Sequence, residues 1–371
     1  MSEPSADPID AEEQSSDAPT SAGDGPERVK GQPGDASEAD ARSTGAPGSE
    51  DEARQSGTHP TVSAEPGIPP RVSGSLLWRI GGVIKTVRPH QWVKNVFVLA
   101  PVVFAKEIFD PLLLTRAAGA FIVFCFLAGA VYTLNDIMDV EADRQHPVKR
   151  HRPIAAGRVP MGFAWGLLMV LVAGSLTGAA IGSIGYLAVA ASYFVLNVAY
   201  SLKLKQVAYL DVGCIAAGFV LRVVGGGLAT RINVSWYLLV CTALLALFLG
   251  FGKRRHELAG AAGRAKKQRA SLENYNKRGL DIALGITAAA TTAVYLAYTL
   301  DAQTKEFFKT EWLWPSTAFV MLGVWRFVHL IRARPKSESP TQEMLKDGPF
   351  VGIVLMWVVL VMWVVYHLRP S

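Results

Sequence analysis

Aromatic residues are absent from the first 70 positions of this 371-residue chain, which contain no Phe, Trp or Tyr. The same segment has 15 acidic and four basic residues, a net charge of −11. A segment with so few apolar side chains cannot offset the entropy that it would lose on ordering. It also lacks the basic start, apolar run and cleavage site of a signal peptide. We therefore predict a disordered acidic N-terminal tail over residues 1–70. We favour a solubilising role for it over the alternatives that it binds a basic partner or folds over the basic face of its own chain.

Cysteine and histidine are scarce as well. The chain has three cysteines and seven histidines. The cysteines all fall in apolar segments and their number is odd, which argues against a disulfide framework, and none has the spacing of metal ligands. No histidine pair has an HExxH-type spacing, which argues against a zinc site. The cysteines are expected to be packing residues; they are Cys125, Cys214 and Cys241.

Apolar residues are abundant beyond the tail. Long apolar runs alternate with short polar connections, which is typical of a polytopic helical membrane protein. Residues 75–88 are too short and too charged to span, and are expected to form an amphipathic helix at the interface. We predict an all-α polytopic membrane domain over residues 71–371 with about nine transmembrane helices. The predicted spans are 92–108, 112–134, 161–179, 184–202, 208–229, 235–252, 280–300, 313–332 and 349–367.

Basic residues give the part of the chain after residue 70 a net charge of +17. They gather in the loops that follow the second and sixth predicted spans, whereas the opposing loops are poorer in Lys and Arg. Because cytoplasmic loops of membrane proteins carry this excess, both loops and the N-terminus are predicted to be cytoplasmic and the C-terminus outside. No nucleic-acid partner is expected.

Three aspartates follow the second predicted span directly, within the segment Asn135–Asp143. On a helix, Asp136, Asp139 and Asp143 would fall within about 60° of one another. Three carboxylates on one face at a membrane edge are costly unless a cation holds them, and oxygen ligands suit Mg²⁺ bound together with phosphate. The alternative is a solvated helix end with acidic residues placed by chance. We favour the metal site.

A basic run follows the aspartates at once, in the stretch HPVKRHRPIAAG (146–157). Lys149, Arg150 and Arg152 are candidates for contacts with phosphate oxygens, since charge-assisted hydrogen bonds to phosphate are strong. The alternative is that these residues only enforce membrane topology. That alternative explains the charge but not the neighbouring aspartates, so a diphosphate bridged by the metal is the preferred interpretation.

A second polar group surrounds the turn between the predicted spans 184–202 and 208–229. Tyr193, Asn197 and Tyr200 share one helical face, and three charged residues follow: Lys203, Lys205 and Asp211. Such residues inside a membrane are functional or hold helices together, and the pattern alone leaves these two roles equally open. Combined with the first motif, the group is interpreted as a second wall of one anion site.

Two further cationic residues lie within or beside apolar segments. Arg222 falls inside the predicted span 208–229 and needs an acidic partner, water or an anionic lipid head; an ion pair is the favoured explanation. Lys94 lies at the start of the predicted span 92–108, close to Arg88 and Asn95. Topology alone could explain the position of Lys94.

The segment Asn135–Asp143 matches the NDxxDxxxD signature, and through it the chain resembles the UbiA-type intramembrane prenyltransferase superfamily over about residues 75–371. Its second motif differs from the usual DxxxD type, because Tyr200, Lys205 and Asp211 form a YxxxLKxxxxxD pattern. That pattern resembles the second motif of the branch of the superfamily that transfers phosphoribose to decaprenyl phosphate. Further similar stretches are RPHQWVKN (88–95), HPVKRHRPIAAG (146–157), GFVLR (218–222) and FGKRRHEL (251–258).

The resemblance implies a UbiA-like bundle in the bacterial inner membrane with a cytoplasmic active site. It implies that Asp136, Asp139 and Asp143 bind Mg²⁺ with support from Asn135, and that the basic run holds diphosphate. Tyr200, Lys205 and Asp211 would complete the sugar-phosphate site, with Asp211 counted among the catalytic residues. Helical angle favours Lys203, whereas the motif match favours Lys205, so either lysine could face the substrate. Lys94 and Arg222 complete the set of candidate substrate-binding residues.

The implied reaction joins 5-phosphoribosyl 1-diphosphate to a polyprenyl phosphate and releases diphosphate, for the synthesis of cell-wall arabinan precursors. A homo-oligomer is also implied. The closest rival is prenyl transfer from a prenyl diphosphate to an aromatic acceptor. A non-enzymatic rival is a lipid-phosphate or anion transporter, although the chain lacks the convincing internal repeat that transporters often show.

Overall fold

The computed structural model describes residues 75–260, 274–333, 343–344 and 346–366. Its contacts divide the chain into the units 1–65 and 66–371, and every described residue belongs to the second. The predicted tail, residues 1–70, lies outside the described residues. Within the described residues the secondary structure is helical and contains no strand. The predicted all-α membrane fold is thereby confirmed.

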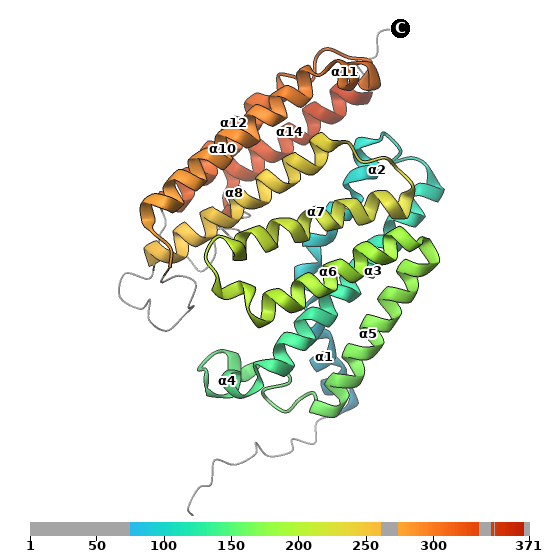
Figure 1. Ribbon diagram of the computed structural model, residues 1–371, viewed down its shortest axis with the longest axis vertical. Coiled ribbons are helices and arrows are strands. Elements are labelled where there is room, and N and C mark those ends of the chain that lie inside the picture. The colour runs from blue at the N-terminus through green and yellow to red at the C-terminus, as the bar shows by residue number, and fades with distance from the viewer. Residues whose placement is uncertain (1–74, 261–273, 334–342, 345, 367–371) are drawn as a thin grey trace, which may run out of the picture. The chain divides into compact units, whose positions relative to one another are not determined.

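Helices follow one another through short connections (Figure 1). In chain order they are α1 (Leu76–Val87), η1 (Pro89–Leu99), α2 (Ala100–Phe104), α3 (Pro111–Met138), α4 (Val140–Gln145), η2 (Lys149–His151), α5 (Met161–Gly182), α6 (Ile184–Leu202), η3 (Leu204–Gln206), α7 (Leu210–Thr230), α8 (Trp236–Gly260), α10 (Lys277–Leu300), α11 (Ala302–Phe308), α12 (Ser316–Ala333) and α14 (Gly348–Tyr366).

Seven of the described helices are long and apolar enough to cross a membrane. They are α3, α5, α6, α7, α8, α10 and α14, so the predicted count of nine is not confirmed. The predicted span 92–108 is built instead from the 3₁₀ helix η1 and the short helix α2. The predicted span 313–332 corresponds to α12, which contains Arg326 and Arg332 and falls outside the seven. The chain is an integral membrane protein.

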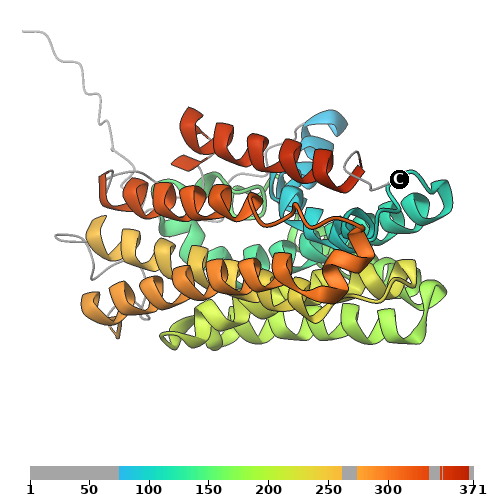
Figure 2. The ribbon, with the colours of Figure 1, turned by 90° about the horizontal axis from the view of Figure 1, so that it is seen from above.

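The long helices lie side by side in the order of the chain from α5 to α8, as Figure 1 shows, and Figure 2 shows the same helices from a second direction. Helix α3 packs against α5, α6, α7 and η1, and 56% of its most apolar window is buried. Only 11% of the corresponding window of α14 is buried. Apolar residues of α14 therefore face outward, as expected for a helix that contacts lipid.

A close approach between η1 and α7 fixes the position of the first polar segment. A methyl group on Gly226 would overlap the backbone carbonyl of Val98, and one on Gly225 would overlap the ring of Phe124. Phe124 and Val98 belong to the core cluster that also contains Tyr186 and Tyr193. The glycines of α7 thus let η1 lie directly against α7, because small residues permit close contact between helix backbones.

Candidate active site

The acidic motif lies where α3 gives way to α4. Asp136 is in the last turn of α3, Asp139 caps its C-terminus, and Asp143 is in α4. Backbone hydrogen bonds from Asp139 to Asn135 and from Asp143 to Asp139 carry the helical pattern across the junction. Asp136 and Asp143 are each only 2% exposed, whereas Asp139 is half-buried. Two of the three predicted carboxylates are therefore withdrawn from solvent.

Arg152 connects the two buried carboxylates. Its Nη1 atom donates to Asp143 Oδ2 at 2.7 Å and to Asp136 Oδ1 at 3.2 Å. The predicted arrangement of these two aspartates on one side of the motif is consistent with this shared partner. Asp139 makes no ion pair with the described basic residues. The sequence predicts that Arg152 holds phosphate. In the structure it forms ion pairs with two carboxylates.

A second arginine reaches the motif from the N-terminal side. Arg88 Nη2 donates to Asp136 Oδ1 at 2.5 Å, and the guanidinium carbon lies 4.9 Å from the centre of the Tyr132 ring. Arg88 has a left-handed backbone conformation, with φ of 56°, at the junction of α1 and η1. Arg88 was expected near the cytoplasmic edge of the membrane, but it was not among the predicted site residues.

Two other basic residues of the following loop, Lys149 and Arg150, are open to solvent. Both lie in η2. The start of this loop is fixed by His146, whose Nδ1 accepts hydrogen bonds from the backbone N–H groups of Val148 and Lys149. The exposed pair is therefore available to an anion arriving from the aqueous side.

The described residues contain no group of three His, Cys, Asp or Glu side chains positioned to hold a metal ion. Asp136 and Asp143 nevertheless converge on a single cationic atom, Nη1 of Arg152. Carboxylate oxygens are the ligands that Mg²⁺ prefers, and it commonly binds through one or two of them together with phosphate. Asp136 and Asp143 could therefore supply oxygen ligands to a Mg²⁺ ion bound together with a diphosphate.

Arg222 lies in a buried polar cluster of its own. The residue is 8% exposed and donates to Asn95 Oδ1 at 2.7 Å, to the Gly218 carbonyl at 2.9 Å and to the Tyr193 hydroxyl at 2.6 Å. Each of these acceptors is neutral, and no salt bridge joins Arg222 to a described acidic residue. The favoured ion-pair explanation for Arg222 is therefore wrong for the part of the chain that the structure describes.

Lys94 connects the two cationic regions electrostatically. Its side chain is accessible, yet the surrounding protein withdraws it from bulk water, and the positive charges of Lys253, Arg222 and Arg88 add to this effect. Together they lower the pKa of Lys94 to about 8. Lys94 also directly precedes Asn95, whose Oδ1 accepts a hydrogen bond from Arg222.

Asp211 is enclosed rather than open. It is fully buried, and its carboxylate accepts from Arg254 Nε at 2.7 Å and from the Tyr275 hydroxyl at 2.5 Å. Arg254 also pairs with Glu257. The same Tyr275 oxygen accepts a hydrogen bond from the backbone of Tyr209, and burial followed by the bond to Asp211 raises the pKa of the Tyr275 hydroxyl. No hydrogen bond or ion pair joins Asp211 to the aspartates of the first motif in the described residues.

The turn after α6 holds the other predicted residues of the second group. Lys203 is exposed and Lys205 is half-buried in η3, so the helix bends between them. Tyr200 is half-buried near the end of α6 and lies within electrostatic reach of Arg254. Asn197 donates to the backbone carbonyl of Tyr193 in the same helix. The turn thus combines two accessible cations with Tyr200.

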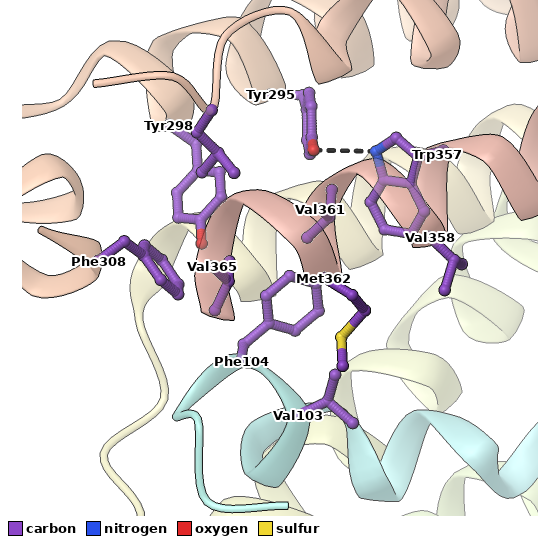
Figure 3. A pocket seen from close by; sticks show the side chains of 11 residues that line it. Val103, Phe104, Tyr295, Tyr298, Phe308, Trp357, Val358, Val361, Met362 and Val365 are labelled. Carbon is purple, nitrogen blue, oxygen red and sulfur yellow. Dashed lines mark hydrogen bonds between the residues drawn. The ribbon is translucent and has the colours of Figure 1, made fainter. Parts of the chain in front are cut away.

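An apolar cavity of about 120 Å³ lies apart from these polar clusters (Figure 3). Side chains from α2, α10, α11 and α14 line it, among them Phe104, Tyr298 and Met362. Trp357 donates from Nε1 to the Tyr295 hydroxyl at 2.9 Å along one wall. No pattern in the sequence indicated this cavity, because α2 lies far along the chain from the other helices that line it.

These features define an integral membrane protein whose helical bundle carries acidic and basic clusters suited to anionic substrates. Residues 96–346 match the UbiA prenyltransferase family, and the chain belongs to this family. The predicted superfamily is confirmed.

Characterised relatives support the same assignment. The chain is 34% identical over 289 residues to the decaprenyl-phosphate phosphoribosyltransferase of Corynebacterium glutamicum, covering 77% of this chain and 87% of that protein. It is 35% identical over 283 residues to the Mycobacterium tuberculosis protein of the same name, covering 75% and 92%. A UbiA homologue from Archaeoglobus fulgidus with bound DMAPP and Mg²⁺ shares the fold, with a TM-score of 0.57, 18% identity and coverage of 77% of this chain and 100% of that chain.

Proposed function

We propose that this protein transfers 5-phosphoribose from 5-phosphoribosyl 1-diphosphate to decaprenyl phosphate and releases diphosphate. The donor and acceptor follow the name of the relatives from Corynebacterium and Mycobacterium, which match most of this chain. The observation that carries the proposal is the pair of buried carboxylates, Asp136 and Asp143, which both form ion pairs with Arg152. Arg88 forms a further ion pair with Asp136. This arrangement suits a diphosphate that binds together with a divalent metal.

The first site binds the diphosphate end of the donor in this proposal. Asp136, Asp139 and Asp143 hold Mg²⁺, with Asn135 supporting them, and a bound Mg²⁺ supplies charge stabilisation to the departing diphosphate. Arg152 and the exposed residues Lys149 and Arg150 contact phosphate oxygens. Tyr200, Lys203 and Lys205, at the turn after α6, bind the sugar-phosphate end.

The chemical step is a displacement at C1 of the ribose. An oxygen of the lipid phosphate forms a bond to C1, while the bond between C1 and the diphosphate oxygen breaks and its electrons leave with diphosphate. A phosphate monoester has a second pKa of about 6, so the nucleophile is already anionic at neutral pH. No general base is required. The protein contributes by orienting both substrates and by stabilising charge on the leaving group.

We also propose that the site opens to the cytoplasm of the bacterium. The exposed residues Lys149, Arg150 and Lys203 lie in connections between membrane helices, where an excess of positive charge is typical of the cytoplasmic side. Labelling of a cysteine introduced by Arg150→Cys, in intact cells, tests this orientation. An impermeant maleimide is expected to react only after the membrane is opened, and reaction in sealed cells would contradict it.

The deciding assay supplies purified protein in lipid nanodiscs with Mg²⁺, labelled phosphoribosyl diphosphate and decaprenyl phosphate. A labelled lipid with inverted configuration at C1 is expected, together with one diphosphate for each lipid formed. Absence of the labelled lipid, with prenyl transfer from a prenyl diphosphate to an aromatic acceptor, would instead favour the prenyltransferase alternative. Vesicle transport of polyprenyl phosphate that survives Asp136→Asn, without any covalent product, would favour the transporter alternative.

A further inference from the structure

Arg222 is a buried cation held only by neutral groups in the described structure. A guanidinium has five N–H donors, and its hydrogen bonds to Asn95, Gly218 and Tyr193 use three of them. Burying a charge in a low-dielectric region is costly unless an opposite charge accompanies it. A position of this kind is suited to an anionic ligand that the protein itself does not supply.

The cluster is built to keep the guanidinium in place. Asn95 is fully buried and its amide is oriented from both ends, because Nδ2 donates to Cys125 Sγ at 3.2 Å while Oδ1 accepts from Arg222. The Tyr193 ring lies 4.6 Å from the guanidinium carbon and the Phe219 ring 5.3 Å. The close contact of Gly226 with Val98 places η1, and with it Asn95, against α7. Arg222 is thereby fixed in orientation before any ligand arrives.

The two sites differ in net charge. In the first site Arg88 and Arg152 are paired with Asp136 and Asp143. Around Arg222 the neighbouring charge is Lys94, whose pKa is lowered by burial and then by nearby cations, including Arg222 itself. The first region suits a metal with its diphosphate, whereas the second suits an anion without a metal.

We propose that Arg222, together with Lys94, binds the phosphate monoester of the acceptor lipid. The inference rests on the proposed transfer reaction and adds to it a separate place for the nucleophile. A displacement at C1 needs the attacking oxygen and the leaving diphosphate on opposite sides of the ribose. The two clusters offer separate places for the two phosphate groups, one with carboxylates at Arg152 and one without at Arg222. Arg222 lies in α7, which is long and apolar enough to cross a membrane, so an anion carried on a lipid suits this position better than a soluble anion does.

The sharpest test is Asn95→Asp, which keeps the shape of the side chain and gives Arg222 an internal counter-ion. If Arg222 binds the acceptor, the KM for decaprenyl phosphate rises about 10- to 100-fold, since charged hydrogen bonds are strong, while the KM for phosphoribosyl diphosphate stays within about twofold. Arg222→Lys keeps the positive charge but loses the planar guanidinium group. Its KM for decaprenyl phosphate is expected to lie between those of the wild type and Asn95→Asp. An unchanged acceptor KM in Asn95→Asp, or a larger rise in the donor KM, overturns the inference.

A binding experiment on the wild-type protein tests, without turnover, whether the protein binds the phosphate group of the acceptor lipid. Thermal unfolding is measured in nanodiscs, without donor or Mg²⁺, in the presence of decaprenyl phosphate or of the neutral alcohol decaprenol. The phosphate is expected to raise the Tm and the alcohol is not, and Asn95→Asp is expected to remove the difference. Equal effects of the two lipids on the wild type contradict the inference. Stabilisation by the phosphate without any transfer product would refute the proposed reaction but retain the anion site.

Discussion

Arg254 donates from Nε to Asp211 Oδ2 at 2.7 Å and thereby joins α8 to α7 through two side chains that are 1% and 0% exposed. The pair lies 43 positions apart in the chain. Asp211 belongs to the second motif by resemblance and was expected to act in catalysis. Its contacts are those of a residue that holds helices together, so stability measurements are needed to separate the two roles.

Asp211→Asn is expected to destabilise the protein by about 1.5–3 kcal/mol, because it removes a charged hydrogen bond from the buried Arg254, which keeps its ion pair with Glu257. Tyr275→Phe removes a single hydrogen bond from the same carboxylate and is expected to cost about 1 kcal/mol. Thermal unfolding in detergent measures both changes. A fully active Asp211→Asn variant with a lowered Tm supports a structural role, whereas an inactive variant with an unchanged Tm supports catalysis.

Asp136→Asn and Asp139→Asn are each expected to reduce turnover about 100-fold or more, because they remove oxygen ligands from the proposed metal–diphosphate complex. Chelation of divalent cations should abolish turnover, and Mg²⁺ should restore it. The matched control is Glu141→Gln, since Glu141 lies in the same segment but is exposed and pairs with Arg144. Activity of Asp139→Asn equal to that of Glu141→Gln would count against the metal site.

Lys94 gives the proposed acceptor binding a dependence on pH. Its ammonium is charged below its pKa of about 8 and loses its charge as the pH rises through that value. A bound phosphate favours the charged form, so the acceptor KM is expected to increase between about pH 7 and about pH 9, by up to about tenfold for each unit of pH above the pKa. Lys94→Arg keeps its charge over this range, and the increase should disappear. The same increase in Lys94→Arg would assign the pH effect to another group.

Gly226→Ala is expected to destabilise the bundle by about 1–3 kcal/mol, because the added methyl group meets the backbone carbonyl of Val98, which cannot rotate away. Gly213 provides the control in the same helix, since nothing lies within 4 Å of a methyl group at that position. Gly213→Ala is expected to stabilise α7 by about 0.5–1 kcal/mol. Tm values of the two variants measure the difference, and an equal effect in both would contradict the close approach of η1 to α7.

The long apolar helices and the acidic motif could be predicted from the sequence because both depend on local patterns. The hydrophobic runs gave α3, α5 and α7 with ends close to those observed. The span expected at 92–108 differs because η1 packs against α7 as a 3₁₀ helix, which depends on the distant Gly226. Local apolar composition carries no information about such a partner.

The partners of the charged residues could not be predicted, because they depend on which helices meet. Arg88 and Asp136 are 48 positions apart, and Asn95 and Arg222 are 127 positions apart. The sequence correctly identified Arg222 and Asp211 as polar residues within apolar surroundings that required an explanation. It assigned a counter-ion to Arg222 and an open site to Asp211, and the described structure places the buried ion pair at Asp211 instead.

The link from Arg152 to Asp136 and Asp143 has a consequence for the order in which ligands bind. Two buried carboxylates and the two arginines that contact them sum to zero charge. A divalent cation alone would give these four side chains and the cation together an excess of two positive charges. A diphosphate alone would give the four side chains and the diphosphate a negative excess. Electroneutrality therefore favours arrival of the two as a preformed complex, so that apparent affinity for the donor should rise and fall with the concentration of free Mg²⁺.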